Sequence, residues 1–421
     1  MPSLSDKLKA LGVKVGASEI QPSTAPVKAR SPLEELLQGR WVPTQRGNTF
    51  VVEQVFPTDY RHGASAIRLE APLGTLAAWA HDERIGELQL SELAFLDTET
   101  SGLSGGTGTY AFMVGAGRFM DGDFHLSIFF MQDPAQEPAL LEALAEFLAP
   151  CSALVTFNGK AFDAPLLRTR YALNNIPCPF EGYAHIDLLP LARRLWRDRL
   201  PSRALKYLEE HIMSAPRNSE EVPGYEIPWL YFDFLRTGDA TPLKGVFYHN
   251  AMDVVAMAAL LSMTARMLAD PHGSDLEHGQ DVIALAKLFE DLNRWEDAAL
   301  LYERGLKTNL PEADFWQAVR RLSALQRRRG DMETALRLWQ QAAAEGHIYA
   351  HVELAKYYEH TRRDPAAALE WTRSAMQHVE KAELPRYIHK HWMEELEHRL
   401  QRLQEKSDKK KKATIKSNPE Q

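Results

Sequence analysis

The stretch Ala94–Gly102 reads Ala-Phe-Leu-Asp-Thr-Glu-Thr-Ser-Gly and places three apolar residues directly before Asp97 and Glu99. We expect a buried β-strand here, because a turn signal follows at residues 101–102. Residues two apart on a strand point to the same face, so Asp97 and Glu99 direct both carboxylates to one place. Two anions held together repel each other unless a cation lies between them, and Mg²⁺ prefers such oxygen ligands. An isolated Asp-x-Glu is common by chance, so a metal site needs further ligands.

The size and composition of the chain limit the function classes. Its 421 residues are enough for two or three domains with a sizeable core. The net charge of −8 indicates that any nucleic-acid surface is local rather than chain-wide. The two cysteines, Cys151 and Cys178, do not form a disulfide framework and fit a reducing compartment. No stretch approaches the roughly 18 apolar residues of a membrane helix, and the N-terminus lacks a secretory apolar core. We therefore expect a cytoplasmic protein with no membrane partner.

The chain divides into four parts by composition. Residues 1–30 mix Ser, Pro, Ala and Lys and predict a disordered N-terminal tail. Residues 31–270 predict a mixed α/β sheet domain, which ends at the boundary signal Asp270-Pro271-His272-Gly273-Ser274. Residues 275–403 are almost purely helical in pattern. Residues 404–421, which include Lys409–Lys412, predict a basic disordered tail.

The sheet domain shows strands before its first long helix. We expect strands at Asn48–Phe56, Tyr110–Phe119 and His125–Met131, a helix at Glu137–Leu148, and strands at Ala153–Phe157 and Tyr183–Asp187. Short turns between the early strands predict that the sheet begins antiparallel. The Gly-rich segment at residues 103–109 does not match G-x-G-x-x-G and leads into a strand, so it does not predict a dinucleotide site.

Two further acidic motifs follow the first. Asn158–Asp163 comes after a predicted strand, and it puts Asp163 near the carboxyl end of that strand, where open α/β sheets bind ligands. Tyr248–Asp253 opens a long helix, on which His249 and Asp253 share a face because they are four residues apart. Either acid alone has a simpler interpretation, Asp163 as a helix cap and Asp253 as a solvated residue. Their occurrence together, in this order and on these elements, favours one acidic site.

The order Asp-x-Glu, Asn-x-x-x-Phe-Asp and a helical motif ending in Asp resembles the DEDD 3′–5′ exonucleases of the ribonuclease-H-like superfamily. The segments Tyr110–Gly115, His185–Leu189 and Tyr248–Asn250 also resemble the YprB-type ribonuclease-H-like family of bacteria. The resemblance covers roughly residues 33–270 and is more specific for the fold and the metal site than for the substrate.

This resemblance implies hydrolysis of phosphodiester bonds with two Mg²⁺ or Mn²⁺ ions. Asp97 would bridge both ions, Glu99 and Asp253 would complete one site, and Asp163 would support the second. The substrate would be single-stranded DNA or RNA. The residues that we assign to substrate binding lie in or next to the three motifs: Thr98, Leu103, Asn158, Lys160 and Tyr248.

The sequence departs from the family pattern at the general base. One exonuclease subclass has His five residues before the last Asp, and the other has Tyr four residues before it. This chain has Tyr248 at five and His249 at four, so the residue types are exchanged. We favour His249 as the base, because a tyrosine with a pKa near 10 is a poor base at neutral pH. The alternative is that His249 only caps the helix or packs against it.

Two features near the site have both a functional and a structural interpretation. Leu191–Tyr207 carries a basic cluster that could bind phosphates without base specificity, or simply form a solvated helical face. Asp187 ends a short predicted strand, where structural hydrogen bonding is a better interpretation than a fifth acid of the site.

The C-terminal part repeats. An Ala-Leu pair at Ala299 recurs in related form at Ala335 and Ala368, at spacings of 36 and 33 residues. Small residues at a period in the thirties indicate stacked helix pairs, which resemble tetratricopeptide or Sel1-like repeats. Such a stack usually binds a protein partner, and the alternative is that these helices only cover the sheet domain.

These observations predict a metal-dependent 3′–5′ exonuclease domain joined to a helical-repeat interaction domain. The rival hypothesis is a weak or inactive nuclease fold that binds nucleic acid while its repeats recruit a partner. An endonuclease on the same fold is a third possibility. The choice between DNA and RNA stays open, because carboxylates and arginines contact phosphate rather than sugar.

Overall fold

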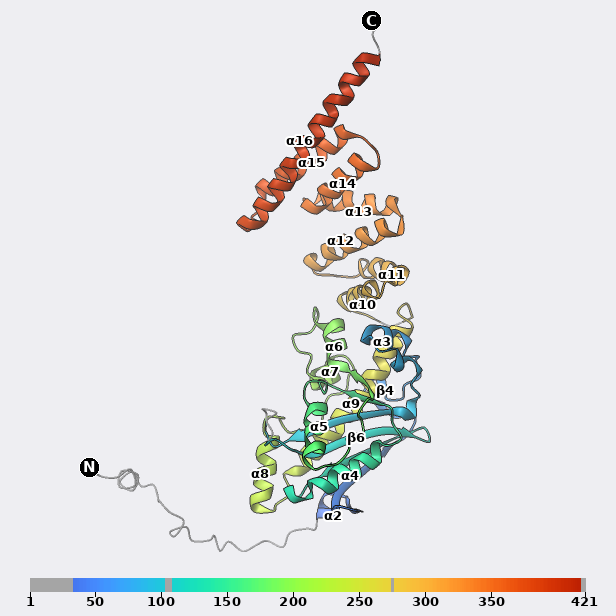
Figure 1. The fold of residues 1–421 in the computed structure, drawn as a ribbon, viewed down its shortest axis with the longest axis vertical. Helices are drawn as coiled ribbons and strands as arrows, with labels where there is room; N and C mark the ends of the chain where they lie inside the picture. The colour runs from blue at the N-terminus through green and yellow to red at the C-terminus, as the bar shows by residue number, and fades with distance from the viewer. Residues whose placement is uncertain (1–32, 103–107, 274–275, 418–421) are drawn as a thin grey trace, which may run out of the picture.

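The computed structural model describes residues 33–102, 108–273 and 276–417, with the side chains of its last helix described as far as residue 406. A sheet domain is followed by an array of helices that stacks away from it along the long axis of the molecule (Figure 1). The predicted N-terminal tail and Leu103 lie outside the described residues.

The sheet domain is built on a seven-stranded mixed sheet with the order β1-β2-β7-β6-β5-β8-β9. Neighbours are antiparallel except at β5, β8 and β9, which run parallel to one another. The predicted strands, their antiparallel beginning and the mixed α/β class are confirmed. The strands are β1 (Arg40–Thr44), β2 (Gly47–Phe56), β5 (Leu93–Thr100), β6 (Ala111–Met120), β7 (Asp123–Phe130), β8 (Ala153–Thr156) and β9 (Ala184–Asp187).

Helices pack on this sheet and connect its strands. The expected helix at Glu137–Leu148 is observed as α4, with the same bounds. The other elements of the domain are α2 (Leu33–Leu37), α3 (Gly74–Ala80), α5 (Asp163–Leu173), α6 (Leu188–Trp196), α7 (Leu205–His211), α8 (Ile227–Thr237) and α9 (Leu243–Ala269), with a small hairpin of β3 (Arg61–His62) and β4 (Ser65–Ala66).

Two glycines of β6 determine how closely α9 lies against the sheet. A Cβ atom at Gly115 would come within 2.2 Å of Asn250 Oδ1, and one at Gly117 would come within 2.9 Å of Val254. Only glycine therefore lets the α9 backbone and these side chains approach β6 without displacement. Since Gly115 is paired with Asp97 in the sheet, this approach also brings α9 next to the first acidic motif.

The composition of α9 corrects one expectation. An 18-residue window of this helix has a mean hydropathy of 1.5 and is long and apolar enough to cross a membrane by length and composition. The prediction that no stretch has this character is therefore wrong. The physical reason is burial, because 72% of the window is enclosed within the protein, and a helix that is apolar all round is typical of a core position.

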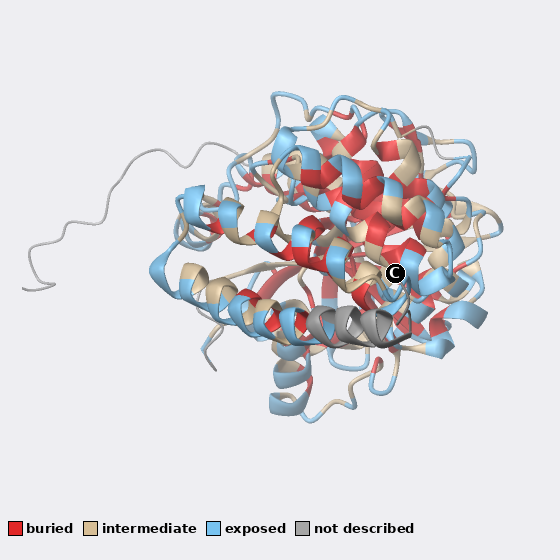
Figure 2. Ribbon diagram, turned by 90° about the horizontal axis from the view of Figure 1, so that it is seen from above, coloured by how far each residue is buried: buried red, intermediate tan, exposed pale blue. Residues whose placement is uncertain are grey.

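The C-terminal array consists of successive helix pairs. Ala299, Ala335 and Ala368 lie in α11, α13 and α15, and all three are buried where these helices contact their neighbours. Figure 2 shows buried positions on the inner faces of the helices and exposed positions on the outer faces. The helices are α10 (Gly279–Asp291), α11 (Trp295–Gly305), α12 (Glu312–Arg329), α13 (Met332–Ala344), α14 (Ile348–His360) and α15 (Pro365–Lys381). The helical class of this region is confirmed, and its assignment to a repeat family stays a prediction.

The last helix, α16 (Arg386–Ser417), is longer than expected. It continues through residues 404–417, for which the sequence predicted a disordered tail. Part of the reason is a buried carboxylate on α14, Glu359, which accepts hydrogen bonds from Arg399, Arg402 and Lys406 of α16. The contact of Lys406 holds the helix against the array beyond residue 403, where we expected the helical part to end.

The junction between the two parts uses two arginines of the predicted basic cluster, Arg194 and Arg199. Arg194 pairs with Asp291 at 2.5 Å, and Arg199 pairs with Asp281 at 2.8 Å, both acids lying on α10. Lys287 of α10 returns a bond to Asp198 at 2.9 Å. These contacts give Arg194 and Arg199 a structural role between domains rather than the phosphate-binding role that was one of two interpretations.

Candidate active site

The first acidic motif lies where β5 emerges from the core. Residues 93–96 of β5 are buried and residues 97–100 are partly exposed, so the carboxylates of Asp97 and Glu99 lie at the point where the strand leaves the apolar interior. Asn250 of α9 donates a hydrogen bond from Nδ2 to Asp97 Oδ2 at 2.7 Å. The fully buried Asn250 therefore fixes the orientation of Asp97.

The second motif contributes Asp163, the first residue of α5. Thr98 donates its hydroxyl hydrogen to Asp163 Oδ1, with an oxygen–oxygen distance of 2.5 Å. Thr98, which we assigned to substrate binding, thus contacts a candidate metal ligand in this structure. Sequence reasoning placed Asp163 near the end of β8, and the contact to Thr98 shows that it lies beside β5.

The loop before Asp163 is held by Asp187. The backbone N–H groups of Asn158 and Lys160 donate to the two oxygens of Asp187 at 2.7 and 3.1 Å. Asn158 has a φ of 71°, a left-handed conformation that asparagine tolerates better than most residues. Asp187 therefore has the structural hydrogen-bonding role that we favoured. Lys160 is an exposed residue of the same loop.

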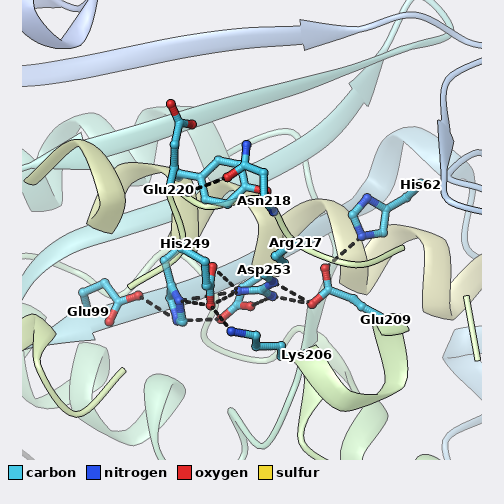
Figure 3. A network of polar contacts seen from close by, with 11 residues as sticks. His62, Glu99, Lys206, Glu209, Arg217, Asn218, Glu220, His249 and Asp253 are labelled. Atoms are coloured by element: carbon cyan, nitrogen blue, oxygen red, sulfur yellow. Dashed lines mark hydrogen bonds and ion pairs between the residues drawn. The ribbon is translucent and has the colours of Figure 1, made fainter. Parts of the chain in front are cut away.

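The third motif lies on α9 and is covered by the connection between α7 and α8. We call this connection, residues 212–226, the strap. Figure 3 shows how Arg217 of the strap reaches into a group of acidic side chains. Arg217 Nη2 contacts Asp253 Oδ1 and lies 2.5 Å from Glu209 Oε2, and Arg217 Nη1 lies 3.1 Å from Glu221 Oε1. The Arg217 side chain is only 2% exposed.

His249 lies between the strap and the first motif. Its Nδ1 is 2.9 Å from Glu221 Oε1, whereas its Nε2 is 3.5 Å from Asp253 Oδ2 and 4.0 Å from Glu99 Oε1. Tyr248 points elsewhere, because its hydroxyl oxygen accepts a hydrogen bond from the Asn218 backbone N–H at 3.1 Å. Of the two candidate bases, His249 is the one that contacts the acidic site.

The electrostatics show that the acids are close enough to influence one another. Burial, together with the charges of Asp253 and Asp163, raises the pKa of Asp97 well above its usual range. Burial and then the charge of Asp97 raise the pKa of Glu99 in the same way. Burial also raises the pKa of Asp163 to about 6, although the hydrogen bond from Thr98 opposes the shift. A cation between these groups would relieve both the repulsion and the cost of burial.

At Glu221 and His249, hydrogen bonds and neighbouring charges outweigh the effect of burial on the pKa. Burial would raise the pKa of Glu221, but the hydrogen bond from His249 and the charge of Arg217 hold it at about 2. Burial lowers the pKa of His249, and the bond to Glu221 and the charge of Asp253 outweigh it, so the net direction is upward. Glu221 of the strap and Asp253 of α9 thus stabilise positive charge on His249.

The donor types fit a hard divalent cation, because Asp97, Glu99, Asp163 and Asp253 supply carboxylate oxygens. The present spacing of these four carboxylates is less favourable for holding a metal ion. Among the described residues, no group of three or more His, Cys, Asp or Glu side chains is arranged so that it could hold a metal ion. The cation that contacts Asp253 in this structure is the guanidinium of Arg217.

Three residues of this site were not predicted to have a role. Asn250 lies inside the third motif and could have been found by asking what orients Asp97. Arg217 and Glu221 lie in a Pro-containing segment with no periodic pattern, and nothing local in the sequence connects them to Asp253 and His249.

Comparison with known proteins supports the coarser part of the assignment. The profile described as RNase_H superfamily matches residues 94–265, from the start of the first motif to the end region of α9. A curated relative, the "Uncharacterized protein YprB" of Bacillus subtilis (strain 168), is 31% identical over 327 residues, which cover 76% of this chain and 78% of the relative.

Among solved structures, the family B DNA polymerase from the hyperthermophilic archaeon Pyrobaculum calidifontis has a TM-score of 0.32 and 15% identity. That match covers 47% of this chain and 29% of the polymerase, so the chain spans less than a third of the polymerase. The identity and coverage of the Bacillus relative, by contrast, are sufficient to define a family. The chain therefore belongs to the YprB family and carries an RNase H superfamily domain in its sheet region.

Proposed function

We propose that this protein is a metal-dependent 3′–5′ exonuclease that hydrolyses phosphodiester bonds in single-stranded nucleic acid. An RNase H superfamily domain implies a nuclease-like function on nucleic acids. The observation that supports a metal-dependent exonuclease is that the three acidic motifs lie close together. Asp97 and Glu99 come from β5, Asp163 from α5, and His249 and Asp253 from α9. The contacts of Asp163 with Thr98 of β5, and of His249 with Glu99, bring these elements together.

Asp97, Glu99, Asp163 and Asp253 would hold two Mg²⁺ or Mn²⁺ ions. When bound, such ions activate the attacking water and stabilise the leaving oxygen. Asn250 keeps Asp97 oriented, and Thr98 does the same for Asp163 through the hydrogen bond that it donates. Asp97 and Asp163 would thus enter the reaction with their carboxylates already directed.

His249 would act as the general base. Its Nε2 faces Glu99 and Asp253, so it can accept a proton from a water bound among the carboxylates. A general base of this kind typically contributes about 10²–10⁴-fold to the rate. Asn158, Lys160 and Leu103 stay candidates for contacts to the substrate, and the helical array is a candidate surface for a protein partner. We also propose a cytoplasmic location, on the cysteine content alone.

The test is digestion of 5′-labelled single-stranded DNA and RNA with Mg²⁺ or Mn²⁺, with Asp97→Ala as the control. A ladder that shortens from the 3′ end, requires metal and is lost in the variant is the expected result. A substrate with a blocked 3′ end separates the exonuclease from an endonuclease, since only the endonuclease would still cleave it.

A second candidate function is supported by one observation. Arg217 already contacts Asp253, which the two-ion mechanism would use as a ligand. A protein that keeps this contact would bind nucleic acid without cutting it and recruit a partner through its helices. Binding of labelled single strands measured by fluorescence anisotropy, with no cleavage in either metal, would favour this scaffold over the nuclease.

A further inference from the structure

The strap contacts α9 just before the third motif and at its first two residues. The two segments approach closely at Gly245, where a Cβ atom would come within 2.5 Å of Val222. Asn218 then bonds Tyr248 and Glu221 bonds His249. The strap is therefore packed against the face of α9 that carries the candidate base.

The contact between Glu221 and His249 fixes more than the position of the ring. Two groups lie near His249 Nδ1, the carboxylate of Glu221 at 2.9 Å and Nη1 of Arg217 at 3.5 Å. A carboxylate can only accept hydrogen bonds and is the closer partner, so its contact places a hydrogen on Nδ1. In the neutral imidazole this leaves Nε2 without a hydrogen, and Nε2 is the atom directed at Asp253 and Glu99. The side chain of Glu221 is 7% exposed, so water has little access to compete for it.

Glu221 is itself held in place. Arg217 Nη1 donates to both of its oxygens, at 3.1 and 3.2 Å. Arg217 is anchored in turn by Glu209, to which both Nε and Nη2 donate. The ring of His249 is thus oriented by a carboxylate whose own orientation is set by a buried guanidinium.

We propose that Glu221 is a positioning residue of this site, which holds His249 in the Nδ1–H tautomer with a bare Nε2 facing the carboxylates. The proposal rests on the proposed function, in which His249 accepts a proton from water. It gives the strap a part in the chemistry, although none of its residues belongs to the three acidic motifs. With the hydrogen on Nε2, the atom that faces the carboxylates would be unable to accept the proton.

The direct test reads the tautomer of His249 without any reaction. Histidine-selective ¹⁵N labelling and long-range ¹H–¹⁵N correlation distinguish the two neutral forms, and His249→Gln identifies the signal by its loss. The spectra are recorded in a pH series, and the tautomer is read above the pH at which the His249 signals stop changing. We expect the Nδ1–H pattern in the wild type and its conversion to the Nε2–H pattern in Glu221→Ala. The neighbouring and exposed Glu220 provides the matched control, Glu220→Ala, which should keep the wild-type pattern.

A conservative variant separates loss of the hydrogen bond from loss of the folded structure. Glu221→Gln keeps an oxygen that can accept from both His249 and Arg217, so we expect it to retain the Nδ1–H pattern. Circular dichroism melting of each variant checks folding. A Glu221→Ala protein that is folded and keeps the Nδ1–H tautomer overturns the proposal, and so does a Glu220→Ala protein that loses it.

Kinetics provide the second measurement and separate this proposal from the one on which it rests. We expect Glu221→Ala to lower kcat by about 10²–10⁴-fold, the range of general base catalysis, with KM changed less than about threefold because no substrate contact is removed. A wild type without nuclease activity would refute the proposed function while the tautomer still tests the role of Glu221. An active wild type with equal kcat in Glu221→Ala refutes the positioning role alone.

Discussion

Replacement of Arg217 by methionine tests how much the buried ion pairs of Arg217 stabilise the sheet domain. The guanidinium is 2% exposed and bonds Glu209, Glu221 and Asp253, and Glu209 is itself fully buried. Removing one partner from a buried charged network costs about 3–5 kcal/mol, because the remaining charges are left uncompensated. Glu209 would keep only His62 among these contacts, at 2.8 Å, which does not replace a permanent charge.

The expected result is a large loss of thermal stability in Arg217→Met. At about 2–4 °C per kcal/mol for a domain of this size, the melting temperature of the sheet domain should fall by roughly 10 °C. The matched control is Arg236→Met, since Arg236 is 75% exposed and pairs with Asp233 on the surface of α8. Exposed pairs contribute about 0–1 kcal/mol, so this control should melt within about 2 °C of the wild type.

The assay is circular dichroism melting of the full chain without added metal, followed by the same melt with Mn²⁺. Because Arg217→Met frees Asp253 from its cation, Mn²⁺ should raise the melting temperature of the variant more than that of the wild type. A variant that melts within about 3 °C of the wild type would refute the reasoning. So would equal stabilisation of both proteins by Mn²⁺, since Arg217 would then not compete for Asp253.

Three further predictions concern other contacts. Asp97→Asn should abolish cleavage and yet stabilise the protein by about 1 kcal/mol, because it removes a repelled carboxylate while Asn250 still finds an oxygen to bond; melting and digestion of the same preparation check both. Gly115→Ala should destabilise by about 1–3 kcal/mol, since the new methyl group would displace Asn250, and a melt within error of the wild type would contradict this. The pKa of Glu359 is lowered to about 2 from 4.5, because the bonds from α16 outweigh the effect of burial, so its stabilisation of α16 is complete above pH 4.5 and is lost as the pH falls through 2. Limited pepsin digestion across this range should release α16 at the low end, and Glu359→Gln should release it already at pH 4.5.

Local patterns in the sequence were enough to predict the framework of the site. Apolar runs interrupted by turn signals predicted the central strands, and helical spacing predicted α4 with the bounds observed. Three acidic motifs were predicted to meet, and the contacts of Asp163 with Thr98 and of His249 with Glu99 and Asp253 place them together. These predictions succeeded because each rests on residues that are neighbours in sequence and on one rule of sheet or helix geometry.

The partners of charged residues could not be predicted in the same way. Arg194 and Arg199 belong to a basic cluster in the sequence, but in the structure each pairs with an acid of α10. These acids, Asp291 and Asp281, follow 97 and 82 residues later. Arg217 likewise meets Asp253 across 36 residues, through a segment without periodicity. Net local charge in a sequence counts charges before they are paired, so it overestimates the basic surface wherever a later helix supplies the counter-charge.

The exchanged order of Tyr248 and His249 places the two side chains in different surroundings. Consecutive residues on an α-helix point about 100° apart, whereas residues four apart share a face. His249 is four residues before Asp253 and therefore lies on the side of α9 that faces Glu99, at 4.0 Å. Tyr248 is turned toward Asn218 of the strap by the same geometry. The exchange thus leaves a histidine beside the carboxylates and a tyrosine in the packing between α9 and the strap, and the side chain that reaches the acids is the one whose ordinary pKa suits a general base near neutral pH.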